Sequence, residues 1–145
     1  MQQPTQINDF LSVAGQISKD DIAAIAQAGF AVIINNRPDN EEPGQLDHHE
    51  AEAEAKKRGL EYRYLPVTTG NITRTEVAEF ARLLLRSPKP VLAHCRSGTR
   101  CYLLWAVGRV LFEHQSALTL VAEAAAKGYD LRILPQLVEK LEAPG

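Results

Sequence analysis

The sequence predicts one α/β domain with a mainly parallel central sheet of four to five strands and helices on both faces. Three observations support this. Short runs of β-branched and other apolar residues alternate with longer segments of helical periodicity. A run such as AVIIN lacks the polar–apolar alternation of a strand that is solvated on one face. The chain has 145 residues, 45% of them hydrophobic, with no repeat or dividing linker. We therefore expect one domain over residues 1–145, with its core over about 10–137.

The N-terminal half is expected to contain three strands and two helices. Residues 10–15 are short and apolar enough for an edge strand, after a loose N-terminal end around Pro4. Ser18 is a favourable N-cap for the first helix, which Gly29 ends. The run at 31–35 is typical of a strand covered on both faces. A loop (36–45), an exposed helix (45–59) and a third strand (61–67) are expected to follow.

The C-terminal half is expected to contain one strand and four helices. Thr73 and Glu76 fit a capping box for the first of these helices. Residues 90–94 are the expected fourth strand, and the helix after it is apolar nearly all round, which predicts a buried helix. The helices are expected over residues 75–87, 101–112, 116–128 and 134–143, the last with Pro135 in its first turn.

Composition argues against several classes of protein. A formal net charge of −2 gives no reason to expect nucleic acid as a partner. No apolar run is long enough to span a bilayer, and the N-terminus lacks a signal-peptide pattern, so a cytoplasmic protein with reduced cysteines is expected. The histidines in DHHE (residues 47–50) diverge by about 100° on a helix. They form no chelating pair, and no metal or cofactor is expected.

The stretch VLAHCRSGTRCYLLW (residues 91–105) contains the residues that indicate chemistry. It runs from an apolar strand through a small polar loop into an apolar helix. Ligands of such sheets bind where strands end and helices begin. Gly98 lets the backbone curl, so the N–H groups of residues 96–100 can converge on an anion, assisted by the helix dipole. Cys95 would lie at the base of this cradle.

These surroundings would activate the thiol of Cys95. A free cysteine has a pKa of about 8.5, and helix N-termini with nearby cations lower it to roughly 3.5–7.5. Arg100 can hold two oxygens of a tetrahedral anion through its planar guanidinium. Attack of Cys95 on phosphorus or sulfur would give a covalent intermediate. The alternative is that Cys95 only packs in the core and Arg100 pairs with one of eighteen acids, which explains the Cys, Gly and Arg spacing less well.

Three segments, NNRPDNEEPGQ, YLPVTTGNIT and HCRSGTRCYLLW, together resemble a bacterial phosphatase-like family. Its members occur alone or fused to metallo-β-lactamase-type hydrolases and are called the β-lactamase hydrolase-like family. The resemblance covers about residues 10–137. It implies the compact fold of dual-specificity phosphatases within the protein tyrosine phosphatase superfamily. It also implies that Cys95 is the nucleophile and that Arg100 binds phosphate. The residues between them, Arg96, Ser97, Gly98 and Thr99, are the anion-binding loop expected above.

The spacing of this loop departs from the main phosphatase superfamily. That superfamily has five residues between its cysteine and arginine, whereas four separate Cys95 from Arg100. Rhodanese-type sulfurtransferases have loops of this shorter size. A shorter loop makes a tighter cradle, which is better suited to a persulfide sulfur than to a full phosphate.

A second departure concerns the leaving-group proton. The phosphatases supply it from an aspartate on a neighbouring loop, but the matching segment PVTTGNIT (residues 66–73) has no Asp or Glu. General acid catalysis is worth roughly 10²–10⁴-fold, so hydrolysis of poor leaving groups should be slow. Asp39 is an alternative acid, although a turn residue after Pro38 is the simpler interpretation.

Three further residues are expected to support the site. Cys101 takes the place where those phosphatases carry a Ser or Thr that bonds the catalytic sulfur. It is either a small capping residue of the buried helix or a resolving thiol that forms a disulfide with oxidised Cys95. His94 is expected to orient the loop through a ring-nitrogen hydrogen bond. Arg37 either lines the mouth of the site or forms a surface salt bridge.

The residues leave three functions open. The first is a phosphatase-like hydrolase with a phosphocysteine on Cys95, acting on a small phosphate ester or a phosphoprotein. The second is a sulfurtransferase that carries a persulfide on the same cysteine, taken from a sulfane-sulfur donor such as thiosulfate. The third is a phosphate- or sulfate-ester binding module without turnover. The sequence does not indicate an oligomeric state.

Overall fold

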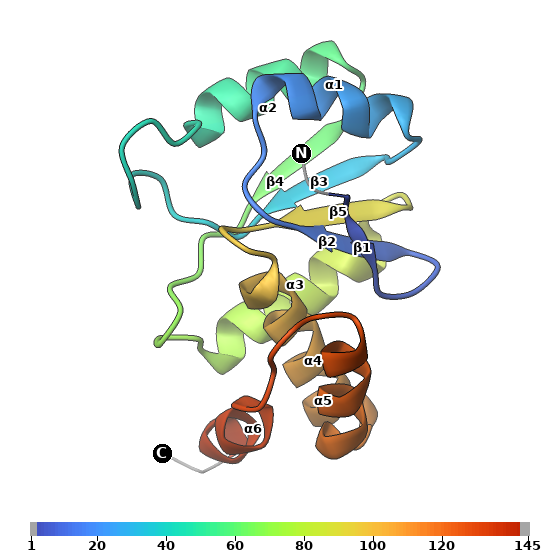
Figure 1. The fold of residues 1–145 in the computed structure, drawn as a ribbon, viewed down its shortest axis with the longest axis vertical. Helices are drawn as coiled ribbons and strands as arrows, with labels where there is room; N and C mark the ends of the chain where they lie inside the picture. Colours follow the sequence, from blue (N-terminus) through green and yellow to red (C-terminus); the bar gives the residue numbers. More distant parts are fainter. Residues whose placement is uncertain (1–2, 143–145) are drawn as a thin grey trace.

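The computed structural model describes residues 3–142, which form a five-stranded sheet between two layers of helices (Figure 1). The strand order is β1-β2-β5-β3-β4, with β1 antiparallel to β2 and the other pairs parallel. The strands are β1 (Thr5–Gln6), β2 (Leu11–Ala14), β3 (Val32–Asn35), β4 (Glu61–Tyr64) and β5 (Val91–His94). The predicted α/β class with a mainly parallel sheet is therefore confirmed.

The six helices are divided unequally between the two faces of the sheet (Figure 1). Two of them, α1 (Lys19–Gln27) and α2 (His48–Lys57), cover one face. The other face is covered by α3 (Arg74–Arg86), α4 (Thr99–Glu113), α5 (Ala117–Ala126) and α6 (Leu134–Glu142). No helix among residues 3–142 is long and apolar enough to cross a membrane.

Local sequence signals explain where the helices begin and end. Ser18 caps α1 and Thr73 caps α3, each in a reciprocal capping box with an acid three residues later. Gly29 follows α1 with a φ of 94°, in the left-handed region that glycine adopts without steric cost. The central helix α4 is buried on most of its surface, as its uninterrupted apolar character predicts.

The hydrophobic core consists of one cluster on each face of the sheet. Val32 and Ile34 of β3 point into the larger cluster, under α3 and α4, whereas Ile33 points into the smaller cluster, under α1 and α2. A strand buried on both faces carries apolar residues at every position, which is why AVIIN shows no alternation. The prediction for this strand is confirmed.

Two predictions at the N-terminus are wrong. The strand expected at residues 10–15 lies inside the sheet, because β1 pairs with it on one side and β5 on the other. The segment after Pro4, expected to be loose, forms the short edge strand β1. Its two residues, Thr5 and Gln6, are too few to show a hydrophobic pattern.

Other boundaries shift by a few residues, as expected for fraying ends. The strand expected over 61–67 ends at Tyr64, and α4 begins two residues before Cys101. The helix expected to be exposed at residues 45–59 is exposed on one side only, since Ala51 and Ala55 pack against the sheet. Residue 143, the expected last residue of the final helix, and the outer ends of the expected 1–145 domain lie outside the described residues.

The register of the sheet determines where the candidate site lies. Ala14, Asn35 and His94, the last residues of β2, β3 and β5, are aligned with one another across the sheet. The segments that follow these three strands therefore leave the sheet at the same edge. Residues 95–100 form one of these segments, as the position of CRSGTR predicts.

Candidate active site

Residues 95–98 connect β5 to α4 by one tight turn, and the loop of residues 95–100 includes the first two residues of that helix. Gly98 caps α4 with a φ of 92°, and a Cβ at this position would lie 2.8 Å from the hydroxyl oxygen of Tyr129. Both observations require glycine. The segment after β2 supports the loop, because the Gln16 N–H donates to the Arg96 carbonyl at 3.2 Å. The loop geometry therefore comes from the sheet as well as from its own sequence.

Cys95 lies at the base of this loop and is 1% exposed. The N–H of Gly98 donates to its Sγ atom at 3.1 Å. A hydrogen bond from the Cys101 side chain, together with backbone N–H groups of Cys101, Ser97 and Gly98, lowers the pKa of Cys95 to about 6 against the effect of burial. Cys95 is therefore mainly a thiolate at neutral pH, the protonation state required of a nucleophile.

Cys101 is the partner of this thiolate in the first turn of α4. Its side chain is fully buried, and burial and the neighbouring Cys95 sulfur raise its pKa well above the usual range. It therefore stays protonated and donates to Cys95. The two cysteines are not joined by a disulfide, and the resolving role of Cys101 remains a prediction.

Arg100 lies in the first turn of α4, and its side chain contacts Glu41 and Val67. Its Nη1 atom donates to the Val67 carbonyl at 2.9 Å and to Glu41 Oε2 at 3.1 Å, and its Nη2 atom donates to Glu41 Oε1 at 3.3 Å. The Nε atom is buried and has no hydrogen-bond partner among the described residues. Arg100 is thus paired with a carboxylate in the geometry with which it would bind two oxygens of an oxyanion.

Arg37 also binds the carboxylate of Glu41. Its side chain is fully buried, with Nε 2.8 Å from Glu41 Oε1 and Nη1 donating to Gln16 at 3.0 Å. Burial raises the pKa of Glu41, but hydrogen bonds from Arg37 and Arg100 outweigh this effect and lower it overall. Arg37 is therefore an interior cation that shares the Glu41 carboxylate with Arg100, and its side chain is not part of the surface.

Glu41 is the site residue that the sequence analysis missed. It lies in the loop between β3 and α2, in the acidic run DNEEPG, where nothing distinguishes it from the exposed Glu42 next to it. Its spacing of four residues from Arg37 is a weak signal outside a helix. Only the folded loop brings it to Arg100, which is 59 residues away in the sequence.

His94 is buried, and neither ring nitrogen forms a hydrogen bond of standard geometry among the described residues. Burial lowers the pKa of His94 to about 4, so the ring is neutral at pH 7. The backbone of Cys95 is nevertheless close enough to the ring to oppose this effect and raise the pKa, and the expected orienting hydrogen bond remains a prediction. The neutral ring is buried at the end of β5.

The remaining loop residues face solvent. Arg96 is exposed and lies 4.0 Å from Glu42, and Ser97 donates to the Thr99 hydroxyl at 3.2 Å. Together with Gly98, these residues supply the backbone N–H groups of the expected anion-binding loop.

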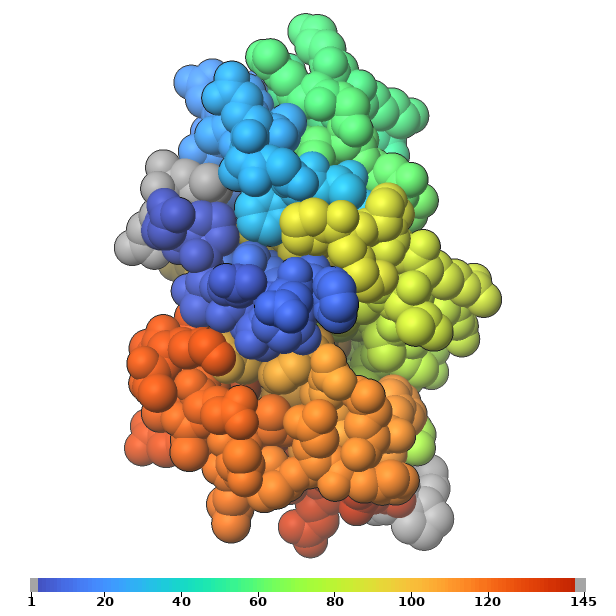
Figure 2. Space-filling model, turned by 90° about the vertical axis from the view of Figure 1, so that its right-hand side faces the viewer, coloured from blue at the N-terminus to red at the C-terminus, as the bar shows by residue number. Residues whose placement is uncertain are grey.

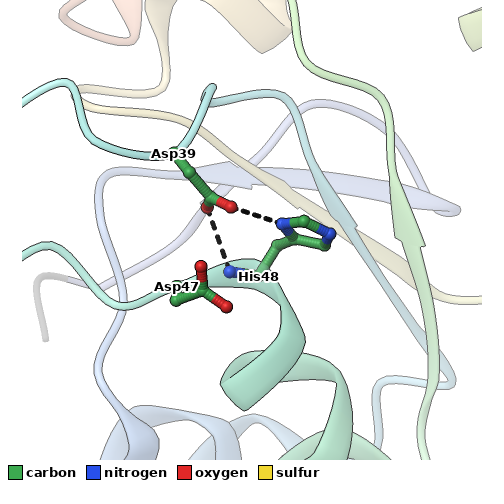
Figure 3. Close-up of side chains that lie close together, drawn as sticks. All are labelled: Asp39, Asp47 and His48. Carbon is green, nitrogen blue, oxygen red and sulfur yellow. Dashed lines mark hydrogen bonds and ion pairs between the residues drawn. The ribbon is translucent and has the colours of Figure 1, made fainter.

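Asp39 is turned toward the start of α2 (Figure 3). It accepts a hydrogen bond from the His48 N–H at 3.0 Å and is paired with the His48 ring. Asp39, Asp47 and His48 each offer one potential metal-ligand atom, and these three atoms lie within 4.8 Å of one another. Such spacing would allow a metal ion to bind. However, Asp47 is the N-cap of α2 and accepts from the His49 N–H. The observed contacts match those of turn and cap residues.

Similarity to known proteins extends over most of the chain. The sequence profile described as beta-lactamase hydrolase-like protein, phosphatase-like domain, matches residues 5–112. A beta-lactamase hydrolase-like protein of Xylella fastidiosa is 36% identical over 125 residues, which are 86% of this chain and 29% of that protein. The chain therefore spans less than a third of the length of this curated relative.

Solved structures show the same fold. The crystal structure of a candidate phosphatase from Neisseria meningitidis superposes with a TM-score of 0.82 at 34% identity, covering 94% of both chains. The core catalytic domain of the PP-IP phosphatase SIW14 from S. cerevisiae, in complex with citrate, gives a TM-score of 0.72 at 16% identity, covering 96% of this chain and 85% of that one. At that identity the likeness concerns the fold alone, which is that of cysteine phosphatases.

Proposed function

The chain belongs to the family of phosphatase-like domains of β-lactamase hydrolase-like proteins, and on this basis we propose that it is a phosphatase-like hydrolase that acts through a phosphocysteine on Cys95. The observation that carries the proposal is the Cys95 thiolate, which is buried and accepts hydrogen bonds from backbone N–H groups of the loop that leads to Arg100. A negative nucleophile beneath hydrogen-bond donors suits attack on a phosphate ester.

The reaction has two steps. The thiolate of Cys95 attacks phosphorus, a P–S bond forms, and the P–O bond to the leaving group breaks. Water then attacks the phosphocysteine, which releases inorganic phosphate and restores the thiolate. Loop N–H groups and Arg100 stabilise the charge on the equatorial oxygens in both steps. The substrate is a small anionic ester, and a phosphorylated side chain of a protein is the larger alternative.

A phosphate substrate must displace the Glu41 carboxylate from Arg100. Glu41 occupies the guanidinium of Arg100, so phosphate binding requires that the β3–α2 loop release it. Arg37, which is fully buried, keeps Glu41 close to the site throughout.

The segment that matches the acid-bearing loop of the phosphatases offers no acid for the leaving group. Residues 66–73 contain no carboxylate, and Val67 of this segment binds Arg100 through its carbonyl. Aryl phosphates, which leave as stabilised phenolates, are therefore the preferred test substrates, and alkyl phosphates should react far more slowly.

The four-residue spacing between Cys95 and Arg100 and the missing acid favour a second candidate, a sulfurtransferase. In that reaction the thiolate takes the outer sulfur of thiosulfate, releasing sulfite and leaving a persulfide on Cys95. Cyanide then removes this sulfur as thiocyanate and restores the thiolate. No leaving-group proton is needed, which matches the absence of a carboxylate from residues 66–73.

Parallel assays separate these functions. The protein is tested with p-nitrophenyl phosphate and with thiosulfate plus cyanide, each beside the Cys95→Ser variant. Phosphate release that disappears with Cys95→Ser supports the hydrolase. Sulfur transfer alone, lost in the same variant, overturns the hydrolase in favour of the sulfurtransferase. Anion binding with neither turnover indicates a binding module, and activity that survives Cys95→Ser in both assays contradicts the shared mechanism.

A further inference from the structure

A pocket lies at the end of the sheet opposite the Cys95 loop. It is lined by Leu11 and Val91, the first residues of β2 and β5, whereas Cys95 follows the last residue of β5. Its walls come from the turn before β2, the C-terminal part of α3 and the C-terminal half of α4. In Figure 2 these blue, yellow-green and orange segments meet on one face of the molecule. Its volume of about 350 Å³ is within the range of small-molecule sites.

The walls of this pocket are unusually apolar for a surface. The described residues include five exposed large hydrophobic side chains, and three of them, Phe10, Leu85 and Phe112, line the pocket. Leu85 is 82% exposed and Phe10 is 56% exposed. Phe80 and Trp105 extend the apolar lining into the interior. Single exposed apolar residues are ordinary, but several around one hollow indicate a binding surface.

The charged groups at the pocket are net positive, although the chain is net negative. Lys89, Arg109 and Glu113 are its only titratable lining residues, which gives +1 from two cations and one acid. Arg109 pairs with Glu113 at 2.7 Å, and its guanidinium lies 5.0 Å from the Trp105 ring centre. Those two charges therefore neutralise each other within the wall.

Lys89 has no such partner. Its ammonium group donates to the carbonyls of Leu84 and Ser87, at 2.8 and 2.9 Å, and forms no ion pair among residues 3–142. It is exposed, so it is a positive charge available to an anion beside an apolar hollow.

We propose that this pocket binds a small amphipathic carboxylate. The hydrocarbon part lies between Phe10, Leu85 and Phe112, and the carboxylate pairs with Lys89. A cationic or neutral amphiphile would fill the same apolar space without using Lys89. The pocket is remote from residues 95–100, so this ligand is distinct from the substrate of the proposed hydrolase, and the inference does not depend on that activity.

The fluorescence of Trp105 can report ligand binding, because Trp105 is the single tryptophan of the chain and lines the pocket. The protein is titrated with decanoate, decanol and decyltrimethylammonium below their micelle concentrations, and tryptophan fluorescence is followed. We expect a saturable change with decanoate, weaker binding of decanol and the weakest binding of the cation. No saturable change with decanoate, or equal binding of the cation, overturns the proposal.

Three variants test the assigned contacts. Lys89→Gln should weaken decanoate binding about threefold to fivefold, the range of an exposed ion pair, and leave decanol binding unchanged. Leu85→Lys should weaken the binding of decanol, whereas Leu118→Lys is the matched control. Leu118 is 75% exposed and lies outside the pocket. Equal effects of the two leucine variants would contradict the pocket assignment.

A second copy of the chain is the competing occupant, and sedimentation velocity tests for it. We expect the same sedimentation coefficient for the wild-type protein and for Leu85→Lys. A dimer that Leu85→Lys dissociates and Leu118→Lys does not would assign this face to self-association and overturn the carboxylate site.

Discussion

The carboxylate of Glu41 joins Arg100 of the candidate active site to the buried Arg37. Glu41 Oε1 is 2.8 Å from Nε of Arg37, and Oε2 is 3.1 Å from Nη1 of Arg100. The side chain of Arg100 is 9% exposed and that of Glu41 26%, so the pair is shielded more than a surface ion pair. This carboxylate occupies the donors that we assign to the oxyanion of the substrate.

Replacing Glu41 with Gln should therefore strengthen oxyanion binding. An amide keeps the shape of the side chain but loses its charge, so phosphate no longer competes with an anion for Arg100. A gain of about 1 kcal/mol in the free energy of anion binding would lower the Kd of tungstate or phosphate about fivefold. Isothermal titration of both anions measures it.

Glu42→Gln is the control for this change. It removes the same charge from the neighbouring position, but Glu42 contacts Arg37 and Arg96 and not Arg100. We expect its effect on Kd to be less than twofold. Weaker binding in Glu41→Gln than in the wild type would show that Glu41 positions Arg100 for the anion and does not compete with it. A melting curve of each variant separates either result from loss of fold.

Ionisation of Cys95 should govern the acid side of the pH profile. Its pKa of about 6 means that thiolate is lost as the pH falls through 6, and kcat/KM should fall with it. The absorbance of the thiolate near 240 nm, measured against Cys95→Ser, reports the same midpoint without substrate. A midpoint near the ~8.5 of an ordinary cysteine would contradict the activated site.

Cys101 should account for much of this shift, because its side-chain hydrogen bond is the largest of the causes that lower the pKa of Cys95. Cys101→Ala removes the donor and should move the midpoint to higher pH, so less thiolate is present at pH 7. Cys101→Ser retains a donor and should keep the midpoint near that of the wild type. Equal midpoints in the two variants would show that the backbone N–H groups are sufficient.

Oxidation tests the resolving role of Cys101. Hydrogen peroxide would convert the Cys95 thiolate to a sulfenic acid, and attack by the Cys101 sulfur would release water and form a disulfide. We expect a mass lower by two hydrogens after mild peroxide and a Cys95–Cys101 peptide in a non-reducing digest. Sulfinic acid on Cys95 without this linkage would exclude the resolving role.

The sequence predicted the elements whose signals are local. Ser18 and Thr73 identify helix starts because a capping residue acts within one turn, and the buried β3 strand is recognisable from a continuous apolar run. The loop of residues 95–100 was expected at the carboxyl edge because a parallel sheet brings strand ends together. The order of the strands was not predictable from these signals, and β1 is only two residues long.

Glu41 shows why part of the candidate site could not be predicted. Its contact with Arg100 depends on how the irregular β3–α2 loop folds over the sheet, and no periodicity encodes that path. The fully buried Arg37 is equally unexpected, because arginine is almost never buried without a partner, and its hydrogen-bond partners Glu41 and Gln16 come from two different loops. Neither partner can be identified from spacing alone.

The planar guanidinium of Arg100 should be required, and not only its charge. Arg100→Lys keeps the positive charge but cannot hold two oxygens at once. We expect kcat/KM to fall about 10–100-fold, with tungstate binding weakened as well. Arg96→Lys is the control, because the Arg96 side chain is 71% exposed and should change either value less than twofold. Wild-type kinetics in Arg100→Lys would remove Arg100 from the site.

Gly98→Ala should lower the stability of the protein more than alanine at any other described glycine with a similar positive φ. At Gly98 a Cβ adds a contact of 2.8 Å with the Tyr129 hydroxyl to the cost of a φ of 92°. At Gly128 the φ is 89° and no atom lies within 4 Å of such a Cβ, so Gly128→Ala measures the backbone cost alone. That cost is about 1–3 kcal/mol.

Thermal unfolding should show Gly98→Ala to be the less stable variant. The pH midpoint of Cys95 ionisation should rise in Gly98→Ala only, because the Gly98 N–H moves away from the sulfur. If both variants lose equal stability and both keep the Cys95 midpoint of the wild type, then Tyr129 does not confine the loop and the Gly98 contact with Cys95 has no effect on the thiolate.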